Sequence, residues 1–531
     1  MSEQKVVDAV VVGAGFAGMY MVHKLTQLGL KVQAFEAGTG VGGTWYWNRY
    51  PGARVDIESM EYSYQFSEEL QQEWNWTERY APQAELLDYA NHVADRFDLK
   101  GHFQFETKVV SAIYDEQARR WQVQTDDGVV TSAKYCIMAT GCLSSMNTPD
   151  IAGLDLFKGD VYHTGSWPHE AVDFTGMKVG VIGTGSSAIQ SIPVIAEQAE
   201  HLTVFQRTAN YSVPAHNQAL KPEFVENIKS NYKEFRAQNS QHAFAASFEP
   251  DDDLAVEATK ETQRARYQER WDYGGLGFLT SFGDLISDQD ANETAKAFIH
   301  GKIESIVDDP ETAALLSPQQ TVGCKRLCVD TGYYATFNRA NVQLVDVSEH
   351  PVDQATKSSV VSHDVEYPLD ALIFATGFDA MTGSLMKIGI QGKSGLTLEK
   401  KWAAGPRTFL GLSTSGFPNF FIISGPGSPS VLTNMMVSIE QHVNWIGDCI
   451  GYLQQHNLSA IEATLDAEND WVDEVNEVAN ETLFPTCNSW YLGANVPGKP
   501  RVFMPYLGFP PYVEKCDEVA KNGYEGFSLS N

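Results

Sequence analysis

The sequence predicts an α/β fold built from two βαβ units and a helical insertion. Two observations lead to this prediction: one glycine-rich turn stands between an apolar strand and a helix near residue 13, and a second stands near residue 183. A third observation is an acidic stretch with helical periodicity, residues 214–322, that follows the second unit. Strand, glycine turn, helix and strand in this order form a nucleotide-binding unit, so the fold class already indicates two bound dinucleotides.

The first unit begins with an apolar, β-branched run. Its parts are a strand, a glycine turn, a helix and a second strand: Val10–Val12, Gly13-x-Gly15-x-x-Gly18, a helical pattern to about Leu28, and Lys31–Phe35. The glycines permit a tight turn against a pyrophosphate, and the helix N-terminus faces the phosphates. Glu36 follows the second strand, where an acid accepts hydrogen bonds from ribose hydroxyls. This Rossmann-like unit therefore suits FAD or NAD.

The second unit repeats the pattern, with alanine in the third glycine position, which the motif permits. Its parts are Val179–Ile182, Gly183-x-Gly185-x-x-Ala188, a helix that Pro193 should kink or shorten, and Leu202–Gln206. Arg207 follows this strand at the place where the first unit has Glu36, and an arginine can pair with a 2′-phosphate. The second unit therefore suits NADP. The other residues predicted to contact it are Thr184, Ser186, Ser187, Gln190 and Thr208.

The amino-acid composition limits the classes of protein to which the chain can belong. The chain has 531 residues, 43% of them hydrophobic and 20% charged, which is typical of a globular protein with more than one domain. Its 38 basic and 68 acidic residues give a net charge of −30, which disfavours nucleic acid and anionic membranes as partners. The first residues do not resemble a signal peptide, and the apolar stretch from Ala9 to about Val22 is too short to span a bilayer. We expect a cytoplasmic protein.

Cysteine usage argues against both disulfides and metal. Seven cysteines are scattered along the chain, and an odd number in a chain of cytoplasmic type does not suggest a disulfide framework. Cys324 and Cys328 are close in sequence, but no second Cys/His pair stands nearby to complete a zinc site. We expect both to be ordinary thiols and expect no metal.

Two further strands end in Ala-Thr-Gly, within residues 136–141 and 371–377. They resemble the crossings between the two domains of two-dinucleotide flavoproteins. This resemblance predicts that both domains are discontinuous. Residues 1–141 and 380–531 would form the FAD-binding domain, residues 142–213 and 323–379 the NADP-binding domain, and residues 214–322 a helical insertion without chemistry of its own.

Two long motifs narrow the chemistry. Residues 157–168 contain Phe157, Gly159, His163, Trp167 and Pro168 in the spacing FxGxxxHxxxWP, which resembles the fingerprint of Baeyer–Villiger monooxygenases. Residues 42–56, GGTWYWNRYPGARVD, resemble the other long signature of that family. The resemblance covers nearly the whole chain, including residues 489–501. Residues 424–443 are similar to the phenylacetone monooxygenase branch rather than to the cyclohexanone monooxygenase branch.

The resemblance implies an NADPH- and O₂-dependent flavin monooxygenase that converts cyclic, aromatic or linear ketones to esters or lactones. In this family NADPH reduces the flavin, oxygen forms a C4a-peroxyflavin, and the peroxide attacks the ketone to give a tetrahedral adduct. Both oxygen species are anionic, so a permanent cation beside them is needed. Arg326 matches the family's active-site arginine, Asp56 its carboxylate partner, and Lys325 a lysine that contacts the NADP phosphate.

The resemblance also assigns supporting residues. Gly43, Thr44 and Trp45 would contact the flavin cofactor, and Trp490 the nicotinamide nucleotide, although a plain core aromatic fits Trp490 nearly as well. His163 would couple the domains rather than act as a general base. The substrate wall would consist of Ile57, Leu432 and Met435. Cys142 stands where phenylacetone-type enzymes tend to have glutamine, which leaves the inherited specificity open.

Other functions were weighed against this one. A flavin monooxygenase that oxidises nitrogen or sulfur shares both glycine motifs and remains the alternative. A pyridine-nucleotide disulfide reductase needs a Cys-x-x-x-x-Cys pair near the first helix, and residues 37–60 contain no cysteine. The expected partners are a small ketone and molecular oxygen, and the expected assembly is a monomer or a weak homo-oligomer.

Overall fold

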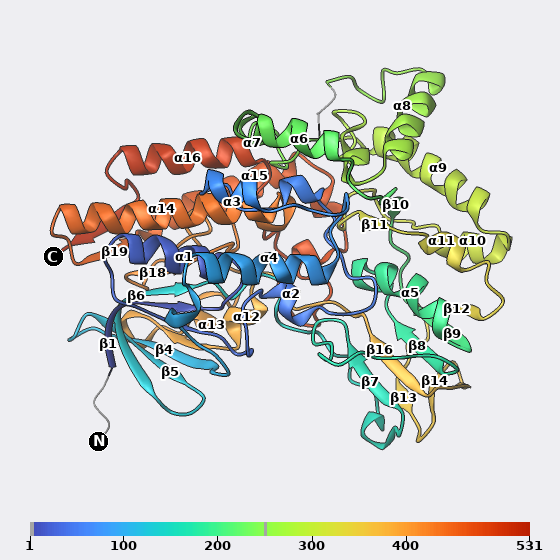
Figure 1. Ribbon diagram of the computed structural model, residues 1–531, viewed down its shortest axis with the longest axis horizontal. Coiled ribbons are helices and arrows are strands. Elements are labelled where there is room, and N and C mark those ends of the chain that lie inside the picture. The colour runs from blue at the N-terminus through green and yellow to red at the C-terminus, as the bar shows by residue number, and fades with distance from the viewer. Residues whose placement is uncertain (1–4, 249–251) are drawn as a thin grey trace.

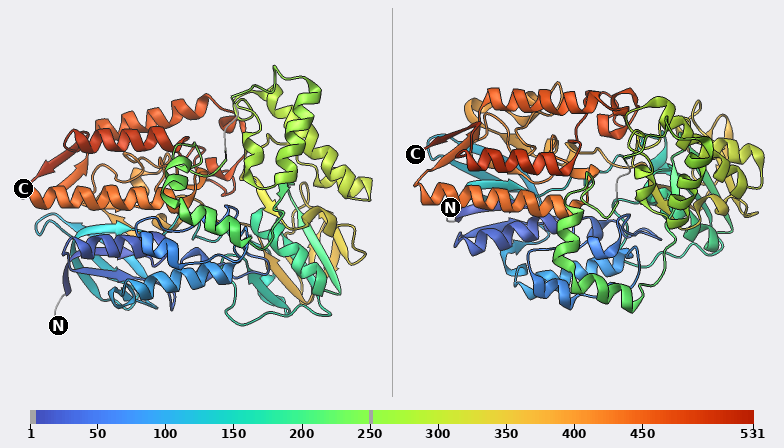
Figure 2. Two further views of the ribbon diagram at one scale, coloured as in Figure 1. Left: turned by 45° about the horizontal axis from the view of Figure 1, so that its top comes forward. Right: turned by 90° about the horizontal axis from the view of Figure 1, so that it is seen from above.

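The computed structural model describes residues 5–248 and 252–531 and arranges them around two parallel or mixed sheets (Figures 1 and 2). In Figure 1 the larger sheet lies on the left, and the second sheet lies at the lower right beneath a group of helices. The first four residues, which belong to the segment that lacks a signal-peptide pattern, lie outside the described part. Among the described residues no helix is long and apolar enough to cross a membrane.

The larger sheet has eight strands in the order β17-β4-β5-β6-β1-β2-β3, and β18 also pairs with β6. Their bounds are β1 Lys5–Val12, β2 Val32–Phe35, β3 Phe103–Gln104, β4 Val109–Asp115, β5 Arg120–Thr125, β6 Val130–Met138, β17 Gly389–Gln391 and β18 Phe420–Ile422. The strands β1, β2, β3, β6 and β18 are parallel, whereas β5 runs antiparallel to β4 and β6. Residues from both ends of the chain therefore build one sheet.

Long helices cover this sheet. They are α1 Phe16–Gln27, α4 Gln83–Arg96, α14 Met435–Gln455, α15 Leu465–Asn480 and α16 Phe509–Lys521. The helix α1 packs against α14, and Tyr20 donates a hydrogen bond of 2.7 Å to Asn444 across their contact. Shorter helices are α2 Thr44–Trp47, α3 Glu68–Glu73, α12 Gly383–Met386 and α13 Leu398–Lys401. A small antiparallel pair joins β19 Ala460–Ala463 to β20 Phe527–Ser530.

The second sheet has five parallel strands in the order β12-β9-β8-β16-β7. Their bounds are β7 Asp160–His163, β8 Lys178–Ile182, β9 His201–Gln206, β12 Val342–Asp346 and β16 Ala371–Phe374. The helix α5 Ser186–Gln198 follows β8 and contains Pro193 in its interior. Of the two predicted effects of Pro193, a kink or a shorter helix, the shorter helix is wrong, because α5 continues past the proline to Gln198. Ile192 and Ile195, on either side of the proline, are fully buried, and their burial offsets the one lost backbone hydrogen bond.

The stretch after the second unit is helical, as predicted. It contains α6 Pro222–Ser230, α7 Tyr232–Asn239, α8 Lys260–Tyr273, α9 Gln289–Ile306 and α10 Pro310–Leu316. A short parallel pair, β10 Ser212–Pro214 with β11 Cys328–Asp330, brackets this insertion, so the chain leaves and returns at one place. The helix α11 Tyr333–Thr336 and the three-stranded sheet of β13 Gln354–Ala355, β14 Ser359–Ser362 and β15 Val365–Pro368 complete the second lobe.

The two Ala-Thr-Gly segments lie directly against the two glycine turns. A Cβ atom on Gly13, whose φ is +108°, would come within 2.5 Å of the Ala139 carbonyl oxygen. A Cβ atom on Gly183, whose φ is +121°, would come within 2.3 Å of the Ala375 carbonyl oxygen. Both turns therefore require glycine for the same two reasons, backbone conformation and close approach of a returning strand.

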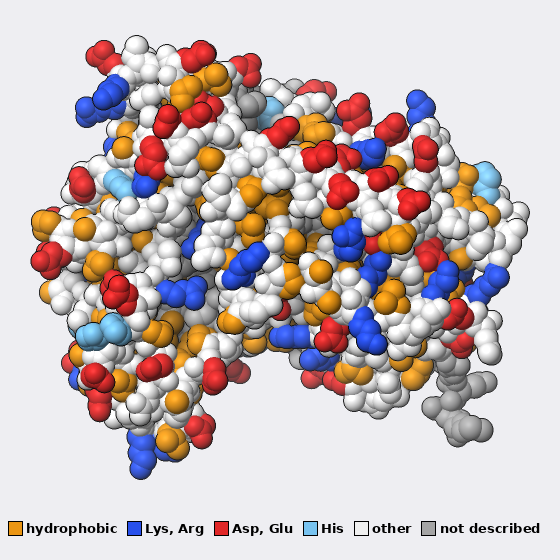
Figure 3. Space-filling view, turned by 180° about the vertical axis from the view of Figure 1, so that it is seen from behind, with side chains coloured by type: hydrophobic (Ala, Val, Ile, Leu, Met, Phe, Trp, Pro, Cys, Tyr) orange, Lys and Arg blue, Asp and Glu red, His pale blue; other side chains and the backbone are white. Residues whose placement is uncertain are grey.

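Acidic side chains are spread over the face shown in Figure 3, with lysines and arginines scattered among them. The whole chain carries a net charge of −30. A phosphorylated ligand must therefore be held by local donors and cations, because the field of the whole molecule repels it.

Candidate active site

The N-terminus of α1 is open to a phosphate group. Its N-cap is Gly15, which supplies no side-chain cap, and a Cβ atom there would meet only backbone atoms of Gly43, the nearest at 3.4 Å. The Glu36 carboxylate lies beside the turn and accepts hydrogen bonds from the amides of Ala14 at 2.8 Å and Gly38 at 2.7 Å. Burial raises the pKa of Glu36, and these bonds oppose the rise. The cradle, with free amides and an adjacent acid, fits FAD.

The 42–56 signature packs on this first cradle. Gly43 lies so close to the glycine turn that a Cβ atom on it would be 2.7 Å from the Gly15 Cα atom. Thr44 begins α2, and the indole N–H of Trp45 donates to the Tyr62 hydroxyl at 3.3 Å. The structure thus brings Gly43 to the turn, whereas the contacts of Thr44 and Trp45 with a flavin stay predictions.

The N-terminus of α5 forms a second cradle. Its N-cap Gly185 also lacks a side-chain cap, and a Cβ atom there would meet nothing within 4 Å. The Thr184 hydroxyl donates to the Thr208 carbonyl oxygen at 2.7 Å, and the Ser186 hydroxyl lies 3.2 Å from the Cys328 sulfur. These open amides at a helix N-terminus fit the pyrophosphate of NADP.

Two other predicted cofactor residues are engaged with protein atoms. The Ser187 hydroxyl lies 3.0 Å from the Thr164 hydroxyl. Gln190 accepts a hydrogen bond from Tyr50 at 2.8 Å and donates to the Arg54 carbonyl oxygen at 3.1 Å. The amide of Gln190 therefore ties α5 to the 42–56 signature, a contact that the sequence did not indicate.

Arg207 and Lys325 converge from segments that are far apart in sequence. Arg207 follows β9, whereas Lys325 stands just before β11. Burial lowers the pKa of Lys325, and the charge of Arg207 lowers it further. Two cations whose charges act on one another in a molecule of net charge −30 would suit an anion. The 2′-phosphate of NADP fits this site because it could relieve the repulsion between the two cations.

Arg326 and Asp56 form a two-point ion pair. The guanidinium Nε and one Nη donate to the two carboxylate oxygens, each at 2.9 Å, and the other Nη donates to the Val431 carbonyl oxygen at 2.9 Å. Burial alone would lower the pKa of Arg326, but the charge and hydrogen bonds of Asp56 raise it above its ordinary value. Arg326 therefore remains a cation at every working pH, and its direction is fixed by three hydrogen bonds.

Three tyrosines around this pair were missed in the sequence. Burial raises the pKa of Tyr50, Tyr62 and Tyr491, and the charge of Asp56 raises each pKa further. All three therefore stay neutral and can act as hydrogen-bond donors. Tyr50 and Tyr491 lie within the motifs at 42–56 and 489–501, and this position is the sequence signal that indicates them.

The predicted substrate residues share the surroundings of the ion pair. Ile57 follows Asp56 directly and is buried, and Leu432 follows Val431, whose carbonyl oxygen binds Arg326. Leu432 lies in a short 3₁₀ helix, Ser430–Leu432, and Met435 begins α14 three residues later. Ile57 and Leu432 thus stand next in sequence to residues that form or bind this ion pair, and their role with Met435 as a substrate wall stays a prediction.

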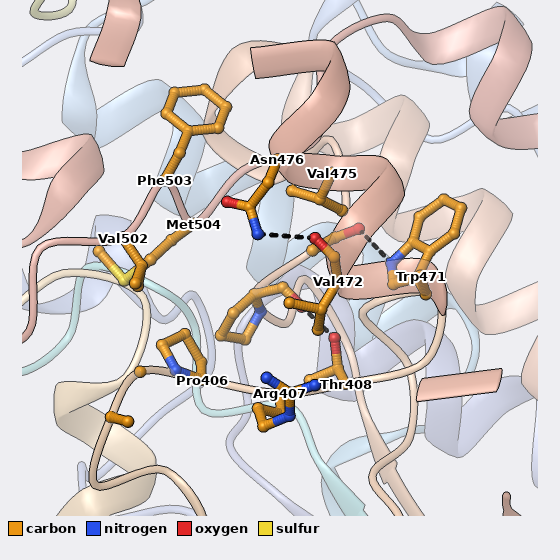
Figure 4. Close-up of a pocket in the computed structure, with 14 residues that line it drawn as sticks. Pro406, Arg407, Thr408, Trp471, Val472, Val475, Asn476, Val502, Phe503 and Met504 are labelled. Carbon is orange, nitrogen blue, oxygen red and sulfur yellow. Dashed lines mark hydrogen bonds between the residues drawn. The ribbon is translucent and has the colours of Figure 1, made fainter. Parts of the chain in front are cut away.

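The loop of residues 426–432 is anchored by a residue of α15 and by a residue of the 404–408 segment. The Trp471 indole N–H donates to the Gly427 carbonyl oxygen at 3.1 Å, and the Thr408 hydroxyl donates to the Pro426 carbonyl oxygen at 2.6 Å. Both residues line the pocket shown in Figure 4, which lies between residues 404–408, 426–427, 471–476 and 502–504. None of the predicted site residues lines this pocket. It is therefore separate from the predicted site, and it adjoins the substrate loop only through Pro426 and Gly427.

His163 has both ring nitrogens engaged with the backbone. Its Nδ1 accepts from the Gly165 amide at 2.9 Å, and its Nε2 lies 3.4 Å from the Asn147 carbonyl oxygen. Burial lowers the pKa of His163, although the contact with Asn147 opposes the shift. Because Asn147 lies in the segment between the two sheets, this geometry supports a coupling role.

The other fingerprint residues surround this strand. Phe157 is buried, and a Cβ atom on Gly159 would lie 2.3 Å from the Asp370 carbonyl oxygen. Trp167 stacks on Tyr162 with ring centres 5.1 Å apart, and its amide donates to the Trp47 carbonyl oxygen at 3.1 Å. Pro168 follows it at the end of the fingerprint.

The prediction that Cys324 is an ordinary thiol was wrong. Cys324 forms a disulfide with Cys487, 163 residues later, whereas Cys328 is free and buried. Sequence spacing cannot show a partner that the fold brings close from a distant segment. The disulfide joins the segment of Arg326 to that of Trp490, which is half-buried with its ring centre 4.2 Å from that of Tyr491.

Comparison with known proteins identifies the family of the chain. A model of the family described as "Pyridine nucleotide-disulphide oxidoreductase" matches residues 10–292. The cyclohexanone 1,2-monooxygenase of Acinetobacter sp is 42% identical over 535 residues, covering 100% of this chain and 98% of the relative. The phenazine N-monooxygenase PhzNO1 of Lysobacter antibioticus is 41% identical, covering 98% of this chain and 97% of the relative.

Solved structures match over the same length. A steroid monooxygenase bound to NADP superimposes with a TM-score of 0.95 at 52% identity, covering 99% of this chain and 100% of that one. A structure described as "OTEMO complex with FAD and NADP" superimposes with a TM-score of 0.96 at 39% identity, covering 99% and 100%.

The fold and the site define a monooxygenase with separate Rossmann-like domains for FAD and NADP, which confirms the predicted fold class and cofactors. The chain belongs to the Baeyer–Villiger monooxygenases, the FAD-containing, NADPH-dependent enzymes that convert ketones to esters or lactones, within the wider pyridine nucleotide-disulphide oxidoreductase family. The absence of cysteine from residues 37–60 separates it from the disulfide reductases of that wider family.

Proposed function

We propose that Arg326 and Asp56 are the groups of this chain that stabilise the negative oxygen during ketone oxidation. The single observation that carries the proposal is the two-point ion pair, with both contacts at 2.9 Å. When bound, FAD and NADPH supply the reducing electrons and the oxygen activation. Arg326 contributes a fixed positive charge, Asp56 fixes its direction, and the apolar wall of Ile57, Leu432 and Met435 excludes water from the ketone.

We infer that the substrate is a ring-containing ketone, with steroid ketones within its range. The support is the apolar wall together with 52% identity to a steroid monooxygenase. The segment 424–443 also supports a place near the phenylacetone monooxygenase branch. Oxidation of a ring nitrogen is a second candidate, because a phenazine N-monooxygenase is 41% identical over nearly the whole chain.

The proposed domain division follows the sheets. Residues 5–138 and 389–422 supply the eight-stranded sheet, and residues 160–206 and 342–374 the five-stranded sheet, which supports the boundaries predicted from the Ala-Thr-Gly segments. We further propose that the enzyme works in the cytoplasm as a monomer or weak homo-oligomer. Gel filtration against standards tests the assembly.

Replacing Arg326 by alanine tests the catalytic proposal. NADPH should still reduce the flavin, because the two cradles are untouched, whereas ester formation should fall by about 100–1,000-fold. Flavin bleaching under nitrogen and gas chromatography of the products measure the two steps separately. A normal ester yield from this variant would refute the role of Arg326.

A substrate panel tests the inferred chemistry. Linear, cyclic, aromatic and steroid ketones and phenazine would be incubated with NADPH in air, and the products identified by mass. An ester or lactone from a ring ketone supports the proposal. Turnover of phenazine without any ester favours the nitrogen oxidation instead.

A further inference from the structure

Glu58, two residues after Asp56, forms a buried ion pair with Arg79 outside the site described above. The Glu58 carboxylate accepts hydrogen bonds from Arg79 Nε at 3.0 Å and from Arg79 Nη2 at 2.7 Å, through the same oxygen. The Tyr273 hydroxyl donates to that oxygen as well, at 3.0 Å. The two charged side chains are only 10% and 11% exposed. A pair held this far from water is rarely placed for surface stability alone.

Arg79 also reaches two other parts of the molecule. Its remaining Nη donates to the Tyr273 carbonyl oxygen at 2.7 Å and to the Ala215 carbonyl oxygen at 3.3 Å. Tyr273 is the last residue of α8 in the helical insertion, and Ala215 directly follows β10. The guanidinium also lies over the Tyr273 ring, 4.3 Å from its centre. One side chain thus joins three segments that are far apart in sequence.

One of these three segments carries Asp56, and another pairs with the strand that follows Arg326. Glu58 stands two residues after Asp56. Ala215 is bonded to the strand that follows Arg326, because its amide donates to the Asp330 carbonyl oxygen at 2.8 Å and β10 pairs with β11. Arg79 therefore fixes the distance between the segment of Asp56 and the segment of Arg326, at a point outside the pair itself.

We propose that Arg79 is a positioning residue that keeps Asp56 and Arg326 in register by clamping Glu58, Ala215 and Tyr273 together. The planar guanidinium suits this task, since it offers donors in several fixed directions, whereas a lysine ammonium is a point charge on a flexible stem. The inference rests on the roles proposed for Asp56 and Arg326. It adds that ketone oxidation depends on a contact in which the helical insertion takes part.

The test compares Arg79→Lys, Glu58→Gln and the double variant in the holoenzyme. The quantity measured is ester formed per NADPH oxidised, using whichever of cyclohexanone, phenylacetone and a steroid ketone the wild type converts fastest. This ratio does not depend on the fraction of protein that is folded. We expect Arg79→Lys to lower it about tenfold, with the excess NADPH appearing as hydrogen peroxide, because small displacements of a catalytic group are costly. NADPH-driven flavin reduction should stay within about twofold of wild type, since the cradles are unchanged.

The double variant should be no worse than the more damaged single variant, because both changes break one clamp. Lys401→Gln serves as the matched control. Lys401 forms a similarly buried ion pair with Glu468 at 2.7 Å, and the printed partners of Glu468 lie outside the segments of Asp56 and Arg326, so the variant should lower the melting temperature and leave the ratio unchanged. If Arg79→Lys fails to fold, Glu58→Gln and Tyr273→Phe, which removes a single hydroxyl, decide the question.

A wild-type ratio in Arg79→Lys, or in both Glu58→Gln and Tyr273→Phe, overturns the inference, whatever happens to the melting temperature. Failure of the proposed function is recognised separately, since it would show as normal ester formation by Arg326→Ala. A lowered melting temperature with an unchanged ratio would assign Arg79 to stability only.

Discussion

At the scale of single residues, charge placement explains how an acidic protein binds two anionic cofactors. Glu36 lies at the first strand end and Arg207 at the second, and Lys325 joins Arg207 from a distant segment. The sign of the side chain at the strand end therefore distinguishes the two sites, since an acid suits ribose hydroxyls and a cation suits a phosphate.

Arg207→Ala should weaken NADPH and leave NADH nearly unaffected. The lost charge-assisted hydrogen bonds correspond to about 1.5–3 kcal/mol, or roughly a 10- to 150-fold rise in the KM for NADPH. Steady-state kinetics with both coenzymes measure the change. Arg339→Ala removes the same charge from an exposed site on the same lobe and is the control. An unchanged preference for NADPH over NADH would show that Arg207 does not bind the 2′-phosphate.

At the scale of elements, buried carboxylates hold α14 and the insertion against the 56–66 segment. Glu440 of α14 accepts from the amides of Gln65 and Phe66 at 2.8 and 3.0 Å, and its second oxygen has no hydrogen-bond partner among the described residues. Glu61 accepts from the Ser247 amide at 2.9 Å. Burial raises the pKa of Glu440 and of Glu61 to about 7, although Arg236 lies near both.

Glu440→Gln should make the protein more stable at pH 8 and change little at pH 5. The folded pKa of about 7 lies above the ordinary 4.5, so the native state retains a proton that the unfolded chain loses. The stability from that proton is complete below about pH 4.5 and is lost as the pH rises through 7.

Glutamine mimics the protonated carboxyl, so the gain at pH 8 should be on the order of 2–3 kcal/mol. Urea unfolding at the two pH values measures it. Glu477→Gln, an exposed change on α15, should show no such difference between pH 5 and pH 8. An equal effect of Glu440→Gln at both pH values would contradict the expectation.

Local patterns predicted the elements better than the contacts between them. Apart from β1, which begins at Lys5 and not at the predicted Val10, the strands of both units begin and end within two residues of the predicted positions, because glycine turns and apolar runs act over short distances. Family motifs located Asp56 and Arg326, and the fold brings them together. The Cys324–Cys487 bond, the tie from Gln190 to Tyr50 and the Arg79 clamp could not be predicted, because each joins segments that only the tertiary fold makes neighbours.

At the scale of the whole molecule, a few polar or covalent ties join the two lobes. Gln190 bonds Tyr50 and Arg54, Arg326 bonds Asp56, and Cys324 is linked to Cys487. The last tie is covalent and closes a loop with a sequence separation of 163 residues. It should therefore restrict the unfolded chain strongly.

Reduction of the disulfide should lower the melting temperature of the wild-type holoenzyme. Loop-closure entropy for a loop of this length gives a stabilisation of up to about 5 kcal/mol. Differential scanning calorimetry with and without a dithiol reductant measures the shift. Cys487→Ser should melt at the reduced wild-type temperature and should not respond to the reductant. Identical melting of the wild type under both conditions would show that the bond does not stabilise the protein in solution.

The paired contacts of Gly13 with Ala139 and of Gly183 with Ala375 have an evolutionary consequence. A strand, a glycine turn and a returning strand that closes over it occur twice in one chain, with the same carbonyl oxygen in the same place. This internal symmetry is what the duplication of an ancestral module would leave, followed by divergence at the strand ends.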